Sequence, residues 1–295
     1  MNFQKASRRK IYYAIILILP ALVLRLFTSL YPVVYTIYLS FFRVNPIVGA
    51  YTYTGLANFQ KMFADLVVRE SVLFTLFFTF ISIAFQTLLG LLVALLLNKR
   101  FSLRYFARTI NLVPWAIPMI VVALGFRWMF DSEYGVIADL IARFVGVRFA
   151  WLVDPWGARW AIVLANVWKN TPFVAMLLLA GLQSVPLELY EAARVDGASG
   201  WHCFRYITIP FLSPIVITTV LFFTVWYLAT FDIVYGMTGG GPGFSTAIMS
   251  YKIYQETFSH MNFGYASAIS VALLLLVAIL GTIVLFISRK FEILL

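Results

Sequence analysis

The chain has 295 residues, of which 62% are hydrophobic and only 12% charged, and its mean hydropathy is +0.92. This composition excludes an ordinary soluble domain and predicts an integral membrane protein. The net charge of +10 would suggest nucleic acid in a soluble protein. Here we attribute it to basic residues that flank membrane spans on the cytoplasmic side, so no nucleic-acid partner is expected.

Cysteine and histidine are too rare for two common kinds of structural site. The single cysteine, Cys203, excludes a disulfide within the chain. With only two histidines beside it, no structural metal site is expected. The apolar runs repeat to the end of the sequence, so we predict one transmembrane domain over residues 1–295.

Six apolar runs are long enough to cross a bilayer as a helix, which takes about 20 residues. The first run follows a basic stretch, as in a signal peptide, but it is too long and has no small-residue cleavage site. It is therefore expected to be an uncleaved first span. We predict an all-α integral membrane fold with spans at about 11–41, 70–97, 107–130, 158–183, 212–236 and 263–287.

The segments between the runs are short and patterned. Residues 42–69 are expected to form a polar loop and residues 237–262 a glycine-rich loop. Within 131–157, apolar residues at helical spacing predict a small amphipathic helix. That stripe consists of Ile137, Leu140, Ile141 and Phe144.

The distribution of Lys and Arg predicts the orientation of the spans. With the N-terminus inside, the inner segments hold twelve such residues, in 1–10, 99–108, 186–210 and 288–295. The outer segments hold seven, in 42–69, 131–159 and 237–262. Because positive charge accumulates in cytoplasmic loops, we expect six spans with both termini in the cytoplasm.

The segment 186–210 is the most polar and most patterned part of the chain. Its proline and acids at 186–191 are typical of a helix start. Asp196-Gly197 is expected to break that helix, since glycine adopts backbone angles that other residues avoid. Apolar residues at helical spacing over 201–207 predict a second helix that ends at Ile209-Pro210. We therefore predict a helix–turn–helix at a membrane face, able to insert into a groove of another protein.

Span four carries polar and aromatic residues on one helix face. Asn166, Lys169, Asn170 and Phe173 are spaced i, i+3, i+4 and i+7. A charge at mid-bilayer costs about 2.5–3.5 kcal/mol, so it usually lines a cavity or meets a partner. Amides can bond sugar hydroxyls and a ring can stack on a pyranose, so this face is a candidate sugar-binding surface. The alternative is a helix–helix contact held by the asparagines.

Span five completes the candidate substrate-binding set with Trp226, Tyr227, Thr230 and Asp232. The first three lie on neighbouring helix faces, and Asp232 points elsewhere. Asp232 either meets Lys169 or lies near the outer interface. The sequence gives no distance, so both possibilities remain open.

No phosphate-binding loop of the form G-x-x-x-x-G-K-[ST] occurs in the sequence. The nearest run, residues 239–243, lacks the lysine. The chain is therefore not expected to hydrolyse ATP or to be an enzyme, and any ATPase would be a separate polypeptide.

The segment 186–210 resembles the EAA loop of the membrane subunits of bacterial ATP-binding-cassette importers. This resemblance implies the type I importer permease architecture, with the loop between spans four and five docking on a cytoplasmic ATPase. It also implies that Glu191 makes a polar contact with the ATPase. The matching residues, and hence the implied coupling surface, are Glu191, Ala192, Ala193, Asp196, Gly197, Phe204 and Pro210.

A second resemblance is to the sugar-importing branch of this family. Trp226, and Thr238 with Gly240-Gly241-Pro242, resemble that branch, and the run 168–173 is similar to permeases for maltose or trehalose. The chain as a whole resembles the larger maltose permease of the two permease subunits in that branch. In that branch the sugar-contacting positions correspond here to Asn166, Lys169, Asn170, Phe173, Trp226, Tyr227 and Thr230. Tyr227 and Thr230 stand where the best-known maltose permease has asparagines, so the sugar is not fixed by the resemblance.

Together the resemblances imply a permease subunit of an ATP-driven, binding-protein-dependent importer in the cell membrane, for a disaccharide such as trehalose or maltose. The implied partners are a second permease, two ATP-binding subunits that hold ATP and magnesium, an extracytoplasmic sugar-binding protein, and membrane lipid. No cofactor is implied in this chain. One alternative is an importer for glycerol phosphate or another polyol, with Lys169 pairing with the anion. A more remote one is an ATP-independent channel or a membrane enzyme.

Overall fold

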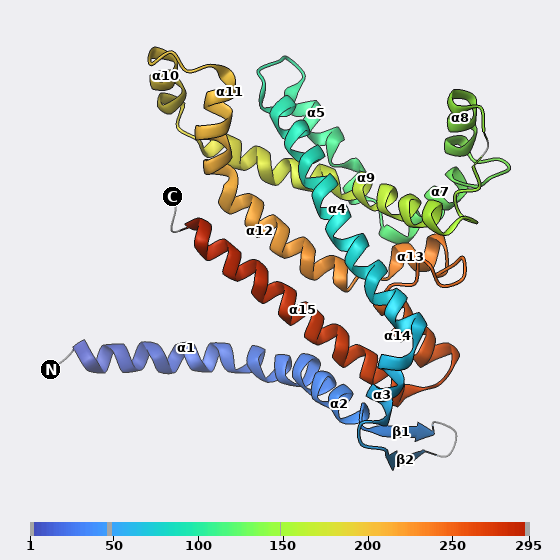
Figure 1. Cartoon of the computed structure of the whole chain (residues 1–295). Coiled ribbons are helices and arrows are strands. Elements are labelled where there is room, and N and C mark those ends of the chain that lie inside the picture. The colour runs from blue at the N-terminus through green and yellow to red at the C-terminus, as the bar shows by residue number, and fades with distance from the viewer. Residues whose placement is uncertain (1–2, 46–48, 148, 293–295) are drawn as a thin grey trace. The chain divides into compact units, whose positions relative to one another are not determined.

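The computed structural model describes residues 3–45, 49–147 and 149–292 and is mainly helical (Figure 1). Arg148, one of the cations assigned above to the outer side, lies outside the described residues. The helices are α1 Phe3–Arg25, α2 Tyr31–Leu39, α3 Ala57–Ala64, α4 Leu66–Asn98, α5 Arg104–Asn111, α6 Val113–Ala116, α7 Met119–Met129, α8 Val136–Val145, α9 Pro155–Ser184, α10 Leu187–Val195, α11 Gly200–Cys203, α12 Ile209–Leu228, α13 Asp232–Met237, α14 Met249–Tyr254 and α15 Phe263–Glu292. Short π-helical turns follow α1, α11 and α14, at Leu26–Leu30, Phe204–Thr208 and Gln255–Ser259.

Among the described residues, five helices are long and apolar enough to cross a membrane: Ile15–Leu39, Leu66–Asn98, Pro155–Ser184, Gly200–Leu228 and Phe263–Ile287. A bent pair, Arg104–Ala116 with Met119–Met129, supplies a sixth if it is counted as one span. The prediction of an all-α membrane protein is thus confirmed, with five spans, or the predicted six when the bent pair is counted as one. The amphipathic helix expected within 131–157 is α8.

The third span is not the straight helix expected over 107–130. The pair is bent by 87° where α6 ends and α7 begins. Ile117 is extended, with ψ 134°, and is followed by Pro118. A proline disfavours the helical conformation of the residue before it and has no N–H to continue the helix, which accounts for the break.

The fifth span also differs from its expected bounds of 212–236. Its helix begins at Gly200 and does not stop at Ile209-Pro210, because a π-helical turn over 204–208 precedes the proline. The Ile209 N–H bonds to the Phe204 carbonyl, five residues back, and such a turn shifts the hydrogen-bond register at the proline. At its other end α12 stops at Leu228, and the short helix α13 begins separately at Asp232.

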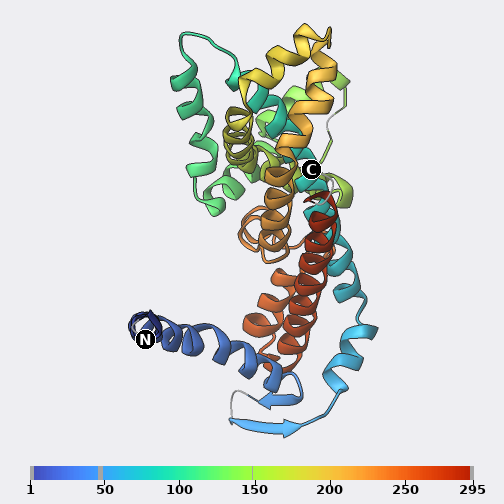
Figure 2. The same cartoon turned by 90° about the vertical axis from the view of Figure 1, so that its left-hand side faces the viewer.

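The chain forms two compact units, residues 1–64 with 253–272 and residues 65–252 with 273–295. In the first unit, β1 Phe42–Asn45 pairs antiparallel with β2 Ala50–Tyr53, within the segment that was expected to be a polar loop. The hairpin lies between α2 and α3 along the chain (Figure 2). The Asn58 amide donates to the Ser40 and Phe42 carbonyls, at 2.9 and 3.0 Å, and so ties α3 to the start of the hairpin.

The core of the second unit lies where α4, α9 and α12 pack together. An aspartate immediately precedes each of α4 and α9: Asp65 accepts the Val67 N–H at 2.9 Å, and Asp154 accepts the Gly157 N–H at 2.7 Å. These caps satisfy N–H groups that have no partner within the helix. Gly90 of α4 faces Val174 of α9, with no room for a side chain between them. The close approach positions α9 and its polar face.

Candidate functional site

A cavity of about 750 Å³ lies in the second unit where helices are interrupted. One wall is the break between α6 and α7, residues 115–119, and another is the break between α12 and α13, residues 229–232. The middle of α9 forms a third wall, where Pro172 lies inside the helix. The structure places six of the eight candidate residues at this cavity: Lys169, Asn170, Phe173, Trp226, Thr230 and Asp232.

Lys169 is a buried cation at the cavity wall, with 7% of its surface exposed. Its Nζ donates to the Trp115 carbonyl oxygen at 2.8 Å. That carbonyl is in the last turn before the helix break, whose carbonyls lack the usual partners within a helix. The broken third span therefore supplies the group that holds the ammonium.

Aromatic rings form much of the remaining cavity wall. Trp115 and Phe173 are stacked, with ring centroids 4.8 Å apart and planes 13° apart. The ring centroid of Phe222 lies 5.4 Å from that of Trp226 and 6.5 Å from that of Phe173. Rings of this kind provide broad apolar faces next to polar groups, an arrangement that suits a molecule with an apolar C–H face and many hydroxyls, such as a sugar.

Asn166 and Tyr227 do not line the cavity but lie behind it, and neither is exposed. The Tyr227 hydroxyl donates to Gln86 Oε1, and the side chains of Asn166 and Asn170 also interact with that hydroxyl. Asn170 Nδ2 donates to the backbone and side-chain oxygens of Asn166, both at 3.0 Å. Asn166, Tyr227 and Gln86 thus form a second layer behind the cavity wall, and this layer holds Asn170, the amide that reaches the cavity.

Gln86 was missed by the sequence analysis, although a signal was present. Within the apolar run of α4, polar residues recur at helical spacing and all are fully buried. They are Ser71, Thr75, Thr79, Ser82 and Gln86. Such a buried polar stripe predicts contact with polar groups of a neighbouring helix. Here the last of them meets Tyr227 of α12.

Lys169 and Asp232 both line the cavity, but no ion pair joins them in the part of the chain that the structure describes. Asp232 is exposed at the first residue of α13. The cavity therefore presents an ammonium and a carboxylate as separate charges. No cluster of three His, Cys, Asp or Glu residues able to hold a metal is found among the described residues.

Residues 187–203 form α10, a turn and α11, in agreement with the helix–turn–helix that the sequence predicted. The rest of the segment is the π-helical turn and the start of α12. The turn contains Gly197, whose φ of +82° favours glycine. Glu191, Ala192, Asp196 and Gly197 are exposed, whereas Ala193, Phe204 and Pro210 are half-buried. Six large apolar side chains of the segment are also exposed: Leu187, Leu189, Val195, Trp201, Tyr206 and Ile209. An exposed apolar group of this kind is typical of a binding surface.

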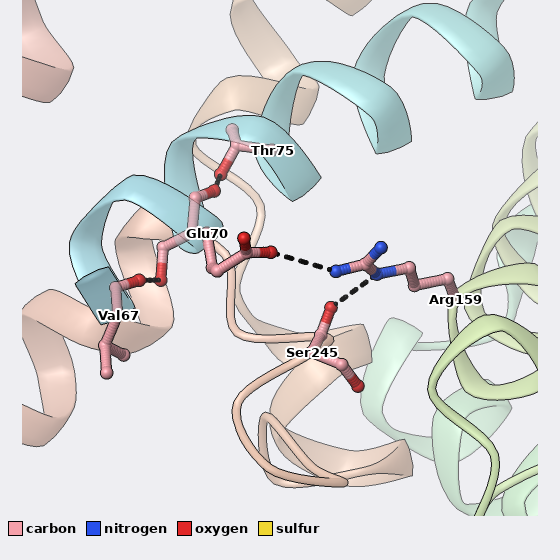
Figure 3. Close-up of polar contacts among 6 residues, drawn as sticks. Val67, Glu70, Thr75, Arg159 and Ser245 are labelled. Carbon is pink, nitrogen blue, oxygen red and sulfur yellow. Dashed lines mark hydrogen bonds and ion pairs between the residues drawn. The ribbon is translucent and has the colours of Figure 1, made fainter.

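Arg159 joins α4, α9 and the glycine-rich loop (Figure 3). Its Nε donates to the Ser245 carbonyl at 2.8 Å, and its Nη2 lies 3.3 Å from Glu70 Oε2. The Thr75 hydroxyl accepts the Met249 N–H at 3.0 Å, which ties the end of this loop to α4. Burial raises the pKa of the nearby Tyr251 hydroxyl, with a smaller contribution from Tyr235, so Tyr251 remains neutral at physiological pH.

Residues 86–293 match the family described as binding-protein-dependent transport system inner membrane component. The sulfoquinovosyl glycerol transport system permease protein SmoG of Agrobacterium fabrum is 40% identical, over 88% of this chain and 85% of that protein. The trehalose/maltose transport system permease protein MalF of Thermococcus litoralis is 38% identical, over 92% of each chain. The chain belongs to this family.

Solved structures agree with this permease fold. A chain of a bacterial transporter that imports the acidic polysaccharide alginate superposes with a TM-score of 0.83, at 22% identity and 98% coverage of both chains. A chain of the MetNI methionine transporter superposes with a TM-score of 0.56 at 21% identity, over 77% of this permease and 96% of that chain. The permease is thus a multi-pass membrane transport subunit whose curated relatives include sugar permeases, as the two sequence resemblances implied.

Proposed function

We propose that this permease is one half of the translocation pathway of an ATP-driven sugar importer, with a disaccharide such as trehalose or maltose as substrate. The cavity between the two helix breaks and α9 carries the proposal, because it combines stacked rings with one amide, one ammonium and one carboxylate. Transporters commonly place substrate sites at discontinuous helices near the middle of the membrane. The names of the relatives, which include a trehalose/maltose permease, support the same substrate class.

In this proposal a second, homologous permease completes the pathway and two copies of a cytoplasmic ATPase bind ATP and magnesium. An extracytoplasmic binding protein delivers the sugar to the outer loops, and both termini of the permease lie in the cytoplasm. The exposed coupling residues of 186–210 dock on the ATPase, with Glu191 as the polar contact. Closure of the ATPase pair then moves this segment, and the helix that continues from it into α12 carries the motion to the cavity.

Purification from the native membrane in mild detergent tests the proposal. We expect a second permease and a nucleotide-binding subunit to co-purify, and a sugar-binding protein to be recovered with them after mild cross-linking. The recovered binding protein can then be screened against trehalose, maltose and other sugars by calorimetry. A chain that elutes alone or only with itself would contradict the importer assignment and favour a channel or a membrane enzyme.

A second candidate substrate class is an anionic polyol such as glycerol phosphate. It is favoured by one observation, the buried Lys169 ammonium that has no carboxylate partner among the described residues. The variant Lys169→Met separates the two classes in uptake assays with reconstituted vesicles. Loss of glycerol phosphate uptake with unchanged trehalose uptake would favour the anion, whereas the reverse pattern would favour the neutral sugar.

A further inference from the structure

A second cavity, of about 580 Å³, lies beneath the α10–α11 pair and is separate from the cavity described above. It opens where two spans end, since Asn98 is the last residue of α4 and Ser184 the last of α9. Figure 1 shows α10, α11 and the end of α4 at the same end of the unit. The cavity therefore lies at the boundary between the hydrocarbon of the bilayer and its headgroups.

One part of the cavity wall is apolar and continuous with the membrane spans. Leu95 and Leu182 come from the last turns of α4 and α9, and Phe204 comes from the turn that leads into α12. The Tyr190 hydroxyl and Thr208 Oγ1 lie 2.9 Å apart and form a hydrogen bond with each other. Because these two polar groups satisfy one another, the wall here is formed mainly by apolar side chains. Such a wall accepts hydrocarbon and has no favourable interaction with a small hydrophilic ion.

The other part of the wall is cationic. Lys99 and Arg194 line the cavity, and no acidic residue does. Neither side chain makes a hydrogen bond or an ion pair with another described residue. Two unpaired cations beside an apolar wall match a molecule with an anionic head and a hydrocarbon tail. Arg and Lys bind phosphate oxygens through charge-assisted hydrogen bonds.

We propose that this cavity binds the phosphate headgroup of an anionic phospholipid, with Lys99 and Arg194 as its ligands. An acyl chain then follows Leu95 and Leu182 into the bilayer. The headgroup links the end of α4, which carries Lys99, to α10, which carries Arg194. The lipid thereby braces the segment that is proposed to receive the motion of the ATPase.

Lipid retention by the purified full-length chain tests this proposal directly. The wild type is exchanged into nanodiscs of phosphatidylcholine doped with phosphatidylglycerol, and the lipid that stays bound is quantified by native mass spectrometry. We expect retained phosphatidylglycerol in the wild type and roughly 25-fold weaker retention in the double variant Lys99→Gln/Arg194→Gln, since each cation contributes a factor of about five. The matched control is Arg100→Gln/Arg205→Gln, two exposed cations that do not line the cavity, and it should retain lipid like the wild type.

Three outcomes would overturn the proposal. One is equal lipid retention by the two double variants, and another is displacement of phosphatidylglycerol from the wild type by phosphatidylcholine. The third is displacement by millimolar inorganic phosphate, which would identify a site for a soluble anion. If the double variant does not fold, the single variant Lys99→Gln and the two wild-type competitions still decide the matter. None of these readouts depends on whether a sugar is transported.

Discussion

At the residue scale, the hydroxyl of Tyr227 joins three helices behind the larger cavity. It donates to Gln86 of α4 and interacts with Asn166 and Asn170 of α9. We expect Tyr227→Phe to cost about 1 kcal/mol of stability, the net value of one buried hydrogen bond. Gln86→Met should cost a similar amount, and the double variant little more, because both remove the same bond.

The measurement for these two single variants and the double variant is the thermal unfolding midpoint of the purified chain in detergent. Tyr206→Phe provides the control, because that hydroxyl belongs to an exposed tyrosine, 67% accessible, and its removal should leave the midpoint unchanged. Additive losses in the Tyr227 and Gln86 variants would show that the two side chains act independently and would contradict the proposed second layer.

The polar face of α9 could be predicted from the sequence because its residues recur at helical spacing within an apolar run. The pattern did not show that Lys169 and Asn170 reach the cavity while Asn166 points into the protein. That difference depends on which neighbours occupy each side of α9. Gln86 was missed because its partner, Tyr227, is 141 residues away in the sequence.

At the element scale, the packing of α4 on α9 depends on Gly90. A Cβ at this position would lie 2.8 Å from Val174 Cγ1 and 3.2 Å from the Ala175 backbone nitrogen. We expect Gly90→Ala to lower the unfolding midpoint by the equivalent of about 1–3 kcal/mol, as overpacked cores do. Gly125→Ala should have no such cost, since nothing lies within 4 Å of its Cβ position. Equal midpoints for the two variants would contradict the close approach.

The connection of α4, α9 and the glycine-rich loop through Arg159 predicts a second element-scale effect. Arg159→Met removes the bond to the Ser245 carbonyl and the contact with Trp156, whose ring centroid lies 4.9 Å away. We expect amide hydrogen exchange over residues 238–248 to accelerate about tenfold, equivalent to roughly 1.4 kcal/mol. Glu70→Gln should change it much less, because the Glu70 side chain is 52% exposed and such pairs contribute little. Unchanged exchange in Arg159→Met would mean that other contacts hold the loop.

The long apolar helices could be predicted from the sequence, whereas their interruptions could not. Composition and length suffice for a span, and α4 and α9 match their predicted ranges within a few residues. The bend at Pro118 and the end of α12 at Leu228 depend on local backbone geometry. Both breaks contribute to the wall of the cavity. The parts that escaped prediction are therefore those that shape the candidate site.

At the scale of the whole molecule, the proposed importer depends on docking of the ATPase at α10. Glu191 is exposed there and its side chain makes no hydrogen bond or ion pair with another described residue, so it is available to a partner. Nearby Val195 and Trp201 are 88% and 65% exposed, a high fraction for apolar side chains facing water. If the ATPase covers this surface, the Glu191 carboxylate becomes buried, and replacing it with a positive charge should weaken docking.

We expect Glu191→Lys to weaken the association with the ATPase by at least about 30-fold, since loss of one buried charge contact costs about 2–5 kcal/mol. The measurement is the amount of ATPase that co-purifies with the tagged permease, together with vesicle uptake of trehalose. Glu188→Lys is the matched control, because Glu188 is exposed on the same helix but does not belong to the proposed coupling surface. If Glu191→Lys lost uptake while retaining the ATPase, Glu191 would transmit motion rather than hold the complex together. If it retained both, the assignment of 186–210 as the coupling segment would be wrong.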